Sequence, residues 1–406
     1  MDKTIRTAPE IRFPGFKEPW EQRRLGNLGT TFTGLSGKAK QDFGHGEAQF
    51  VTYMNVYTNP ISKLNMTEHV EIDNRQNKVQ FGDIFFTTSS ETPEEVGMSS
   101  VWLDNSDNTY LNSFCFGFRP KTSLSPYYMA YMLRSAGVRE KIIFLAQGIS
   151  RYNISKNRMM NIEVPLPTLN EQEKIGAFFK SVDALIFLHQ RKHDFLQELK
   201  RGMLQVMFPQ KGEKVPKVRF PGFTSPWEQR KLGDFGSVAM CKRIFKNQTA
   251  ESGDIPFYKI GTFGGRPDAY ISKELFDEYK KKYSYPENGD ILISASGSIG
   301  RTVEYTGENA YYQDSNIVWL KHDNRIQNSF LKHLYEIIKW AGIEGSTIKR
   351  LYNNNILKTE VMVPSVKEQK IIGNYFEKLD NLITLHQRKL EQLREMKKGL
   401  LQKMFI

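Results

Sequence analysis

Residues Thr168–Phe208, TLNEQEKIGAFFKSVDALIFLHQRKHDFLQELKRGMLQVMF, form the stretch that organises the chain, because this stretch occurs twice. The second copy, Ser365–Phe405, reads SVKEQKIIGNYFEKLDNLITLHQRKLEQLREMKKGLLQKMF, and its His386 lies at an offset of 197 from His189. Each copy follows a proline and opens with a capping box, Thr168-x-x-Glu171 or Ser365-x-x-Glu368, and neither contains an internal proline. The sequence therefore predicts two long helices.

Apolar residues recur through both stretches with a heptad period, which is typical of a coiled coil. The predicted a and d positions are Ile175, Phe178, Val182, Leu185, His189, Lys192, Leu196, Leu199, Met203 and Val206 in the first copy, and Ile372, Tyr375, Leu379, Leu382, His386, Lys389, Leu393, Met396, Leu400 and Lys403 in the second. Two such helices in one chain most simply pair with each other, and we expect an antiparallel pair.

The predicted seam contains a polar layer at the centre of each copy, within the shared segments Leu188–Lys192 and Leu385–Lys389. One interpretation is that the seam breaks there and the segment is solvated. The other is that the layer fixes the register, because a polar core position penalises alternative pairings. We favour the second interpretation, in which the two central layers of an antiparallel pair meet.

The overall composition is that of a globular protein with two or three domains: 406 residues, 39% hydrophobic and 25% charged. The chain contains no apolar run of the roughly 18 residues that span a bilayer, and its first residues lack the apolar core of a signal peptide. Cys115 and Cys241 are the only cysteines, which argues against a disulfide framework or a cysteine-based zinc site. We expect a cytoplasmic protein, and the formal net charge of +12 fits a polyanionic partner.

A second segment, which we call the leader, is also repeated. Ile11–Gly26, IRFPGFKEPWEQRRLG, recurs as Val218–Gly233, VRFPGFTSPWEQRKLG, at an offset of 207 from Phe13 to Phe220. Its prolines, glycine and aromatic residues suit a packed turn that enters a strand. We interpret the leader as architecture rather than chemistry.

Between leader and helix, the two halves share an order of elements but few residues. Strand-like runs at 49–57, 82–88 and 113–119 correspond to runs at 255–260, 289–294 and 315–321, and each half continues with a helix (126–134 or 330–338), a polar loop and a strand that ends in Val-Pro. The predicted fold class is α+β: two similar α+β domains separated by a pair of long antiparallel coiled-coil helices, with an internal pseudo-two-fold repeat. The predicted boundaries are 1–164, 165–208, 209–217, 218–363 and 364–406.

Motifs for catalysis are missing at the usual checkpoints. Gly34–Ala39 lacks the spacing of a phosphate-binding loop, and Ala295 stands where a dinucleotide fingerprint needs its first glycine. The adenine-methyltransferase tetrapeptide is absent as well. His189 and His193 are four residues apart, but His189 is a predicted seam residue, so a structural histidine is the better interpretation. We therefore expect no catalytic residue, no cofactor and no metal site.

The variable regions instead offer side chains suited to nucleic-acid contacts. Arg151-Tyr-Asn and Arg350-Leu-Tyr-Asn place a guanidinium, an aromatic ring and an amide at the same point of each half; arginine binds phosphate or guanine, and asparagine pairs with adenine. Each single residue has the alternative of being an ordinary solvated side chain. The candidate DNA-binding residues are Lys38, Lys40, Arg151, Tyr152, Asn153, Lys242, Arg243, Lys246, Ser294, Ser296, Ser298, Arg301, Lys349, Arg350, Tyr352 and Asn353.

Taken together, two variable domains, each closed by an arginine-containing loop and a Val-Pro strand end and joined by helices that begin Glu-Gln-x-x-Ile, resemble the specificity subunit of type I restriction–modification enzymes. The resemblance extends from Ile11 to Phe405. It implies that each variable domain is a target-recognition domain that reads one half of a split double-stranded DNA site. It also implies that two methyltransferase subunits dock on the helices, that restriction subunits join them, and that these partners perform adenine methylation and ATP-driven cleavage.

The predicted helix length agrees with this implication, because a helix of about 39 residues is roughly 58 Å long and reaches past a dozen base-pair steps. Two alternatives stay open. The first is a self-sufficient DNA-modifying enzyme, which a cofactor-binding assay would reveal. The second is a coiled-coil interaction scaffold that binds no DNA, which a gel shift at low salt would separate from a DNA-recognition subunit.

Overall fold

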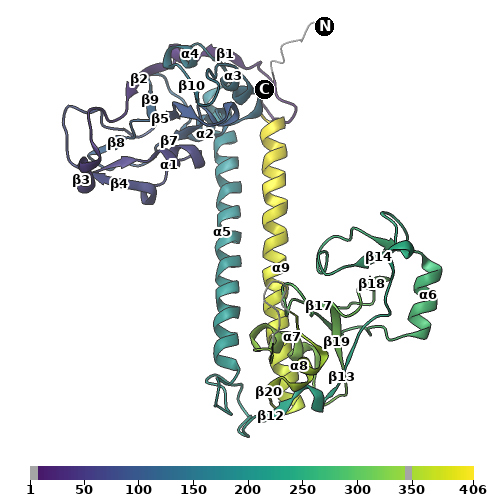
Figure 1. The fold of residues 1–406 in the computed structure, drawn as a ribbon. Coiled ribbons are helices and arrows are strands. Elements are labelled where there is room, and N and C mark those ends of the chain that lie inside the picture. Colours follow the sequence, from purple (N-terminus) through teal and green to yellow (C-terminus); the bar gives the residue numbers. More distant parts are fainter. Residues whose placement is uncertain (1–7, 343–349) are drawn as a thin grey trace. The chain divides into compact units, whose positions relative to one another are not determined.

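The fold was analysed in a computed structural model that describes residues 8–342 and 350–406. The chain forms two compact units: Met1–Gln190 with Arg388–Ile406, called unit 1, and Arg191–Gln387, called unit 2. The two predicted long helices are present as α5 (Leu169–Met207) and α9 (Val366–Lys403), and each unit holds one part of each helix (Figure 1). Within the described ranges, no helix is both long and apolar enough to cross a membrane.

Unit 1 contains a four-stranded antiparallel sheet of order β2-β9-β5-β7 and a three-stranded sheet of order β4-β3-β8, in which β3 and β8 are parallel. Two short ladders, β1-β11 and β6-β10, complete it. The strands are β1 (Glu21–Arg24), β2 (Gly29–Thr33), β3 (Phe43–Val51), β4 (Thr67–Val70), β5 (Ile84–Thr87), β6 (Ser89–Ser90), β7 (Ser99–Val101), β8 (Thr109–Leu111), β9 (Cys115–Pro120), β10 (Tyr152–Asn153) and β11 (Glu163–Leu166). The short helices are α1 (Tyr53–Thr58), α2 (Pro126–Met132), α3 (Ala136–Phe144) and α4 (Lys156–Met160).

Unit 2 repeats this topology with sheets of order β13-β19-β16-β17 and β15-β14-β18 and a β12-β20 ladder. Its strands are β12 (Glu228–Lys231), β13 (Gly236–Ala239), β14 (Ile255–Tyr258), β15 (Tyr270–Ile271), β16 (Ile291–Ser294), β17 (Thr302–Glu304), β18 (Tyr311–Tyr312), β19 (Ile317–His322) and β20 (Glu360–Val363), and its short helices are α6 (Lys273–Lys282), α7 (Asn328–Ile337) and α8 (Asn353–Lys358). The prediction of two similar α+β domains is confirmed. One predicted strand ran too far: residues 53–57 belong to helix α1, which Thr52 caps by accepting from Asn55 N–H.

The core of each unit is an aromatic cluster in which the leader, a short helix and both long helices meet. In unit 1, Trp20 lies edge-on to Tyr128, and Phe179 of α5 stacks on Phe405 with ring centroids 5.7 Å apart. In unit 2, Trp227 lies edge-on to Phe330, and Phe208 lies 6.1 Å from Phe376 of α9. The residue that completes each cluster, Phe405 or Phe208, comes from the far end of the other long helix, and burying such rings is the largest stabilising term in a core.

The polar side chains at the start of each long helix bind the leader and the short helix. Arg12 makes a two-pronged ion pair with the fully buried Glu171 at 2.7 and 2.8 Å, and Arg219 makes the same pair with Glu368 at 2.7 Å. Gln172 accepts from Ser125 N–H ahead of α2, as Gln369 accepts from Gln327 N–H ahead of α7. The capping-box prediction is thus wrong for the two glutamate side chains, which pair with arginine, although Ser365 Oγ does accept from Glu368 N–H.

The helices pair in antiparallel orientation within each unit. In unit 1, Asp183 of α5 contacts Lys397 of α9 at 2.5 Å and Arg394 donates to Gln190; in unit 2, Lys200 contacts Asp380 at 2.7 Å. Asp183 corresponds to Asp380 and Lys200 to Lys397, so the same interhelical ion pair forms once in each unit.

The buried stripe of the helices differs from the predicted seam at several of the predicted d positions. Ile175, Val182, Leu196, Ile372, Leu379 and Leu393 are buried as predicted, with Leu199 and Leu400 half-buried. The prediction is wrong for Leu185, Leu382 and Met396, which are 46%, 42% and 43% exposed. It is also wrong for Lys192, Lys389 and Lys403, which are exposed. At several predicted d positions the buried residue is the next one along the helix. These buried residues are Phe179, Met207, Phe376, Leu390 and Met404, each at most 4% exposed. His189 and His386 belong to different units, so their proposed meeting stays a prediction.

Candidate nucleic-acid interface

Arg151 and Arg350 occupy equivalent places in the two units. Arg151 directly precedes β10, which pairs with β6, and its Nη2 lies 3.4 Å from Ser89 Oγ. Arg350 pairs through its backbone with Ser296, and its Nη2 lies 3.5 Å from Asn316 Oδ1. Ser89 and Ser296 each lie two residues beyond the end of a central strand, β5 in unit 1 and β16 in unit 2. The fold therefore places each exposed arginine at the equivalent end of the larger sheet of its own unit.

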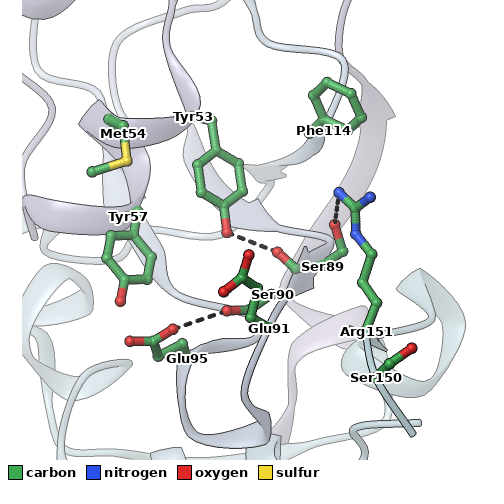
Figure 2. A pocket seen from close by; sticks show the side chains of 10 residues that line it. All are labelled: Tyr53, Met54, Tyr57, Ser89, Ser90, Glu91, Glu95, Phe114, Ser150 and Arg151. Atoms are coloured by element: carbon green, nitrogen blue, oxygen red, sulfur yellow. Dashed lines mark hydrogen bonds between the residues drawn. The ribbon is translucent and has the colours of Figure 1, made fainter. Parts of the chain in front are cut away.

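A cavity of about 780 Å³ opens beside Arg151 in unit 1 (Figure 2). Its walls are formed by Tyr53, Met54, Tyr57, Ser89, Ser90, Glu91, Glu95, Phe114, Ser150 and Arg151. Tyr53 and Tyr57 lie nearly parallel, one helical turn apart on α1, and Tyr53 Oη donates to Ser89 O at 2.7 Å. Met54 and Phe114 are more than half exposed. A basic group, carboxylates and aromatic faces therefore share one concave surface.

The two tyrosines in this cavity were missed at the sequence level, because Tyr53–Tyr57 lies in a run that alternates like a strand. Glu95 is held inside the cavity by Tyr57 and by Ser90 Oγ at 3.1 Å, and these hydrogen bonds lower the pKa of the Glu95 carboxyl below its ordinary value. The hydroxyl of Thr52, which caps α1, was the one signal that favoured a helix at this point.

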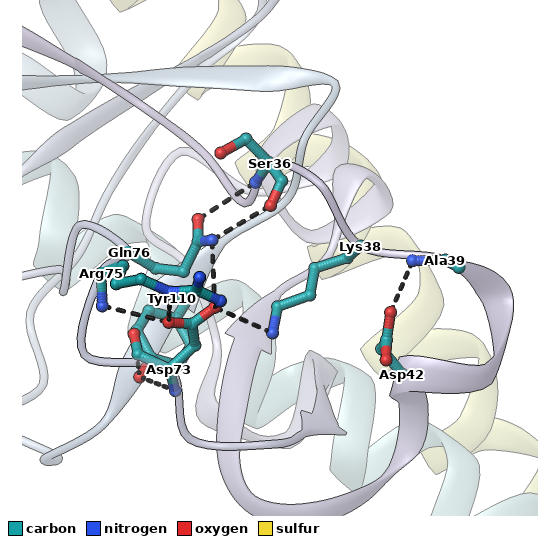
Figure 3. Close-up of polar contacts among 8 residues, drawn as sticks. All are labelled: Ser36, Lys38, Ala39, Asp42, Asp73, Arg75, Gln76 and Tyr110. Carbon is teal, nitrogen blue, oxygen red and sulfur yellow. Dashed lines mark hydrogen bonds and ion pairs between the residues drawn. The ribbon is translucent and has the colours of Figure 1, made fainter.

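Of the two lysine candidates in unit 1, Lys38 is fixed by an ion pair and Lys40 is exposed. Lys38 Nζ lies 3.1 Å from Asp73, and both side chains are largely buried, at 14% and 9% exposure. Asp73 also binds Arg75, and Tyr110 Oη donates to Asp73 O (Figure 3). Arg75 first and Lys38 second hold the pKa of Asp73 well below its usual range. Lys38 therefore fixes a loop, while Lys40 is exposed at its tip.

The basic candidates of unit 2 are exposed on the segment that follows β13. Lys242 lies over the Tyr283 ring at 5.1 Å, Arg243 is 3.9 Å from Asp314 and remains 68% exposed, and Lys246 starts a short 3-10 helix. These residues form a cationic surface whose role in DNA contact stays a prediction.

The serine-rich loop Ser294–Arg301 is shaped by its own hydrogen bonds. Ser294 is 2% exposed; its Oγ donates to Ser298 O and accepts from Arg301 N–H. Ser296 is nearly buried and donates to Asn316. Ser294 thus supports the loop. Of the four candidates in it, Ser298 and Arg301 are exposed, and Arg301 Nη1 donates to Phe263 O.

The remaining candidates lie around the two arginines. Tyr152 and Asn153 form β10, Tyr352 is 48% exposed at the start of α8, and Asn353 is its first residue. Lys349 lies outside the described residues.

One group in unit 2 has the side chains of a metal site. Ligand atoms of His333, Glu336 and Asp380 lie within 4.8 Å of one another. Lys200, however, contacts Glu336 at 2.8 Å and Asp380 at 2.7 Å. The ammonium group occupies the position that a cation would take, so we interpret the group as an ion-pair network that links α5, α7 and α9.

Comparison with known proteins identifies the family to which this chain belongs. A sequence profile of the family described as "Type I restriction modification DNA specificity domain" matches residues 17–198 and 224–395. Because the two matches cover most of the chain, the chain belongs to this family and carries its domain twice. The resemblance to type I specificity subunits is thereby confirmed.

Individual proteins described as type I specificity subunits are similar to this chain in sequence and fold. A putative type I restriction enzyme specificity subunit of Haemophilus influenzae is 48% identical over 242 residues, which is 59% of this chain and 61% of that protein. The putative MjaX specificity subunit of Methanocaldococcus jannaschii is 23% identical over 95% of this chain and 92% of its own. The fold is similar to the crystal structure of an S subunit from M. genitalium, with a TM-score of 0.58 at 16% identity over 98% of this chain and 99% of that one.

Proposed function

We propose that the chain is the DNA-recognition subunit of a type I restriction–modification complex and that it reads a bipartite double-stranded site. The observation that carries the proposal is the repeated placement of Arg151 beside Ser89 in unit 1 and of Arg350 beside Ser296 in unit 2, at the equivalent end of the larger sheet of each unit. Guanidinium groups that project from matched loops suit phosphate or guanine contacts. Each unit then reads one half-site, and the DNA between the half-sites is not read.

The long helices are the proposed docking surface for two methyltransferase subunits. Leu188 and Leu385 occupy equivalent positions and are 61% and 59% exposed, and the neighbouring Leu185 and Leu382 are also exposed. Apolar side chains repeated on both helices offer the same surface twice, which suits two copies of one partner. In this proposal the chain is not an enzyme: methylation belongs to these partners, and cleavage belongs to restriction subunits that join them.

The experiment that tests the reading role is methylome sequencing of cells with and without this gene, combined with a domain replacement. Replacing residues 28–164 by the corresponding segment of a relative changes one half of the methylated motif and leaves the other half and the spacer unchanged. A change in both halves contradicts modular reading. Methyl transfer by the purified chain alone would establish the enzyme alternative, and failure of the complex to shift duplex DNA at low salt would establish the scaffold alternative.

The docking surface is tested by Leu188→Glu and Leu385→Glu, with Gln197→Glu on an exposed face of α5 as the matched control. Each leucine variant reduces the number of bound methyltransferase subunits from two to one, and the double variant binds none, as read by native mass spectrometry. Two bound copies on the double variant contradict the proposed surface.

A further inference from the structure

Glu91 is an acidic side chain on a surface that we propose faces DNA. It lines the same cavity as Arg151 and the exposed Phe114 (Figure 2). Glu91 is exposed, and its carboxylate has no hydrogen-bond or ion-pair partner among the residues that the structure describes; the nearby Glu95 accepts hydrogen bonds from Tyr57 and Ser90. The two carboxylates therefore differ: Glu95 supports the wall, and Glu91 is available to a ligand.

A free carboxylate on such a surface is repelled by phosphate groups, because like charges oppose close approach. Its presence is favourable only where it meets hydrogen-bond donors. In duplex DNA the donors in the major groove are the exocyclic amino groups, N4 of cytosine and N6 of adenine, and a glutamate carboxylate pairs most directly with cytosine N4. Arg151, on the same rim, supplies the positive charge that offsets the local repulsion from the backbone.

Unit 2 lacks this carboxylate at the equivalent position. Counting from the ends of β5 and β16, Ser89 corresponds to Ser296 and Glu91 to Ser298. The residue just before the adjacent strand also differs, since Phe114 precedes β9 and Asn316 precedes β19. The arginine and its serine are shared and the neighbouring side chains are not, which is the pattern of a common anchor beside different base contacts.

We propose that Glu91 is a specificity-determining residue of unit 1, and that its carboxylate accepts a hydrogen bond from the exocyclic amino group of one base, cytosine in the first instance, in the half-site read by that unit. The inference rests on the proposed DNA-reading function and adds to it the chemical class of base that unit 1 selects.

The first test replaces Glu91 by methionine, which keeps the side-chain length and removes the acceptor. The control is Glu94→Met, an exposed acid of the same loop that does not line the cavity. Both variants lose one negative charge, so both bind non-specific DNA slightly more tightly. Only Glu91→Met relaxes one position of one half-motif in the methylome, with a loss of discrimination of roughly tenfold or more. An unchanged motif, or a change in the half-motif assigned to unit 2, overturns the proposal.

The second test removes the amino group from the DNA. Wild-type and Glu91→Met complexes with methyltransferase subunits are titrated with duplexes in which each cytosine of the half-site is replaced by 2-pyrimidinone, or each adenine by purine. At one position the wild-type complex loses about tenfold in affinity and the variant loses little, because the interaction is already absent. If the base at that position is cytosine, the result supports a contact of Glu91 with cytosine N4. If the base is adenine, the result supports a contact with an exocyclic amino group but not with cytosine. Equal losses at all positions overturn both, while failure of the wild-type complex to bind DNA overturns the proposed function instead.

Discussion

Two regions of each unit differ in how far their contacts repeat. The first, called the frame, consists of the leader, the long helices and the short helix that packs on them; the second, called the reading end, consists of the loops around Arg151 or Arg350. At the frame, the arginine–glutamate pair recurs from Arg12–Glu171 to Arg219–Glu368, and the interhelical ion pair recurs from Asp183–Lys397 to Asp380–Lys200. The glutamine contact recurs as well, and so does the aromatic cluster, with phenylalanine in place of one tyrosine. At the reading end the arginine and the serine beside it recur, as Arg151 with Ser89 and Arg350 with Ser296. The neighbouring side chains do not recur: they are Glu91 and Phe114 in unit 1, and Ser298 and Asn316 in unit 2. A surface that must hold a fixed geometry is constrained by buried partners, whereas an exposed loop tolerates change.

The largest expected effect concerns the buried ion pair of the frame. Arg12→Ala leaves Glu171, which is fully buried, without its partner, so the free energy of unfolding falls by about 3 kcal/mol. Arg219→Ala has the same effect in unit 2, and both are measured by urea denaturation followed by tryptophan fluorescence. The control is Arg24→Ala, whose ion pair with Glu163 is exposed and whose effect is less than about 1 kcal/mol. Equal effects at Arg12 and Arg24 would break the contrast between frame and surface.

Glycines in the long helices give a second test of how closely the frame is packed. A Cβ on Gly176 would lie 2.8 Å from Tyr127 Cβ and Tyr128 N, and one on Gly373 would lie 2.7 Å from Ser329 Cβ. Gly176→Ala and Gly373→Ala therefore destabilise the protein by about 2 kcal/mol, since α2 or α7 must move away. Gly202→Ala and Gly399→Ala are matched controls with nothing within 4 Å, and they stabilise by up to about 1 kcal/mol through helix propensity. A stabilising Gly176→Ala would show that the close approach is unimportant.

At the reading end, Arg151→Ala and Arg350→Ala each weaken binding of the complex to its DNA site by about tenfold, or about 1.4 kcal/mol, without changing stability. Where the lost contact is to phosphate, the slope of log affinity against log salt falls by about one. Fluorescence anisotropy at several salt concentrations measures both, with Arg24→Ala as the control. Wild-type affinity and an unchanged methylated motif in both variants would mean that the contact loops lie elsewhere.

The smallest effect is expected for the interhelical ion pairs, which are partly exposed. A double-mutant cycle on Asp183→Asn and Lys397→Met gives a coupling energy of about 1 kcal/mol, at the upper end of the range for such pairs. The cycle on Asp380→Asn and Lys200→Met gives a larger value, because Lys200 and Asp380 are less exposed, at 15% and 26% against 20% and 33% for Lys397 and Asp183. Equal coupling in the two cycles would remove this difference between the two ion pairs.

The sequence by itself determined the repeat, both long helices, the α+β class and the family, because each depends on order and periodicity along the chain. It did not determine which residues of the helices face inward. Phe178 and Phe179, Leu185 and Ile186, and Leu382 and Ile383 are adjacent apolar pairs, so two heptad frames fit almost equally. The heptad register seen in the structure also places Lys200 and Lys397 inward. A register chosen by the number of apolar residues at inward positions would not select it.

The tertiary structure decided that choice, since Phe179 and Phe376 pack beneath α2 and α7 while each inward lysine meets an aspartate of the other helix. It likewise turned Glu171 and Glu368 away from the capping role that their spacing predicts and toward the leader arginines, and it made Tyr53–Thr58 a helix that lines the cavity of unit 1. The partners in these contacts are separated by tens to hundreds of residues. Local periodicity carries no information about such pairs, whose energies depend on burial that exists only in the folded chain.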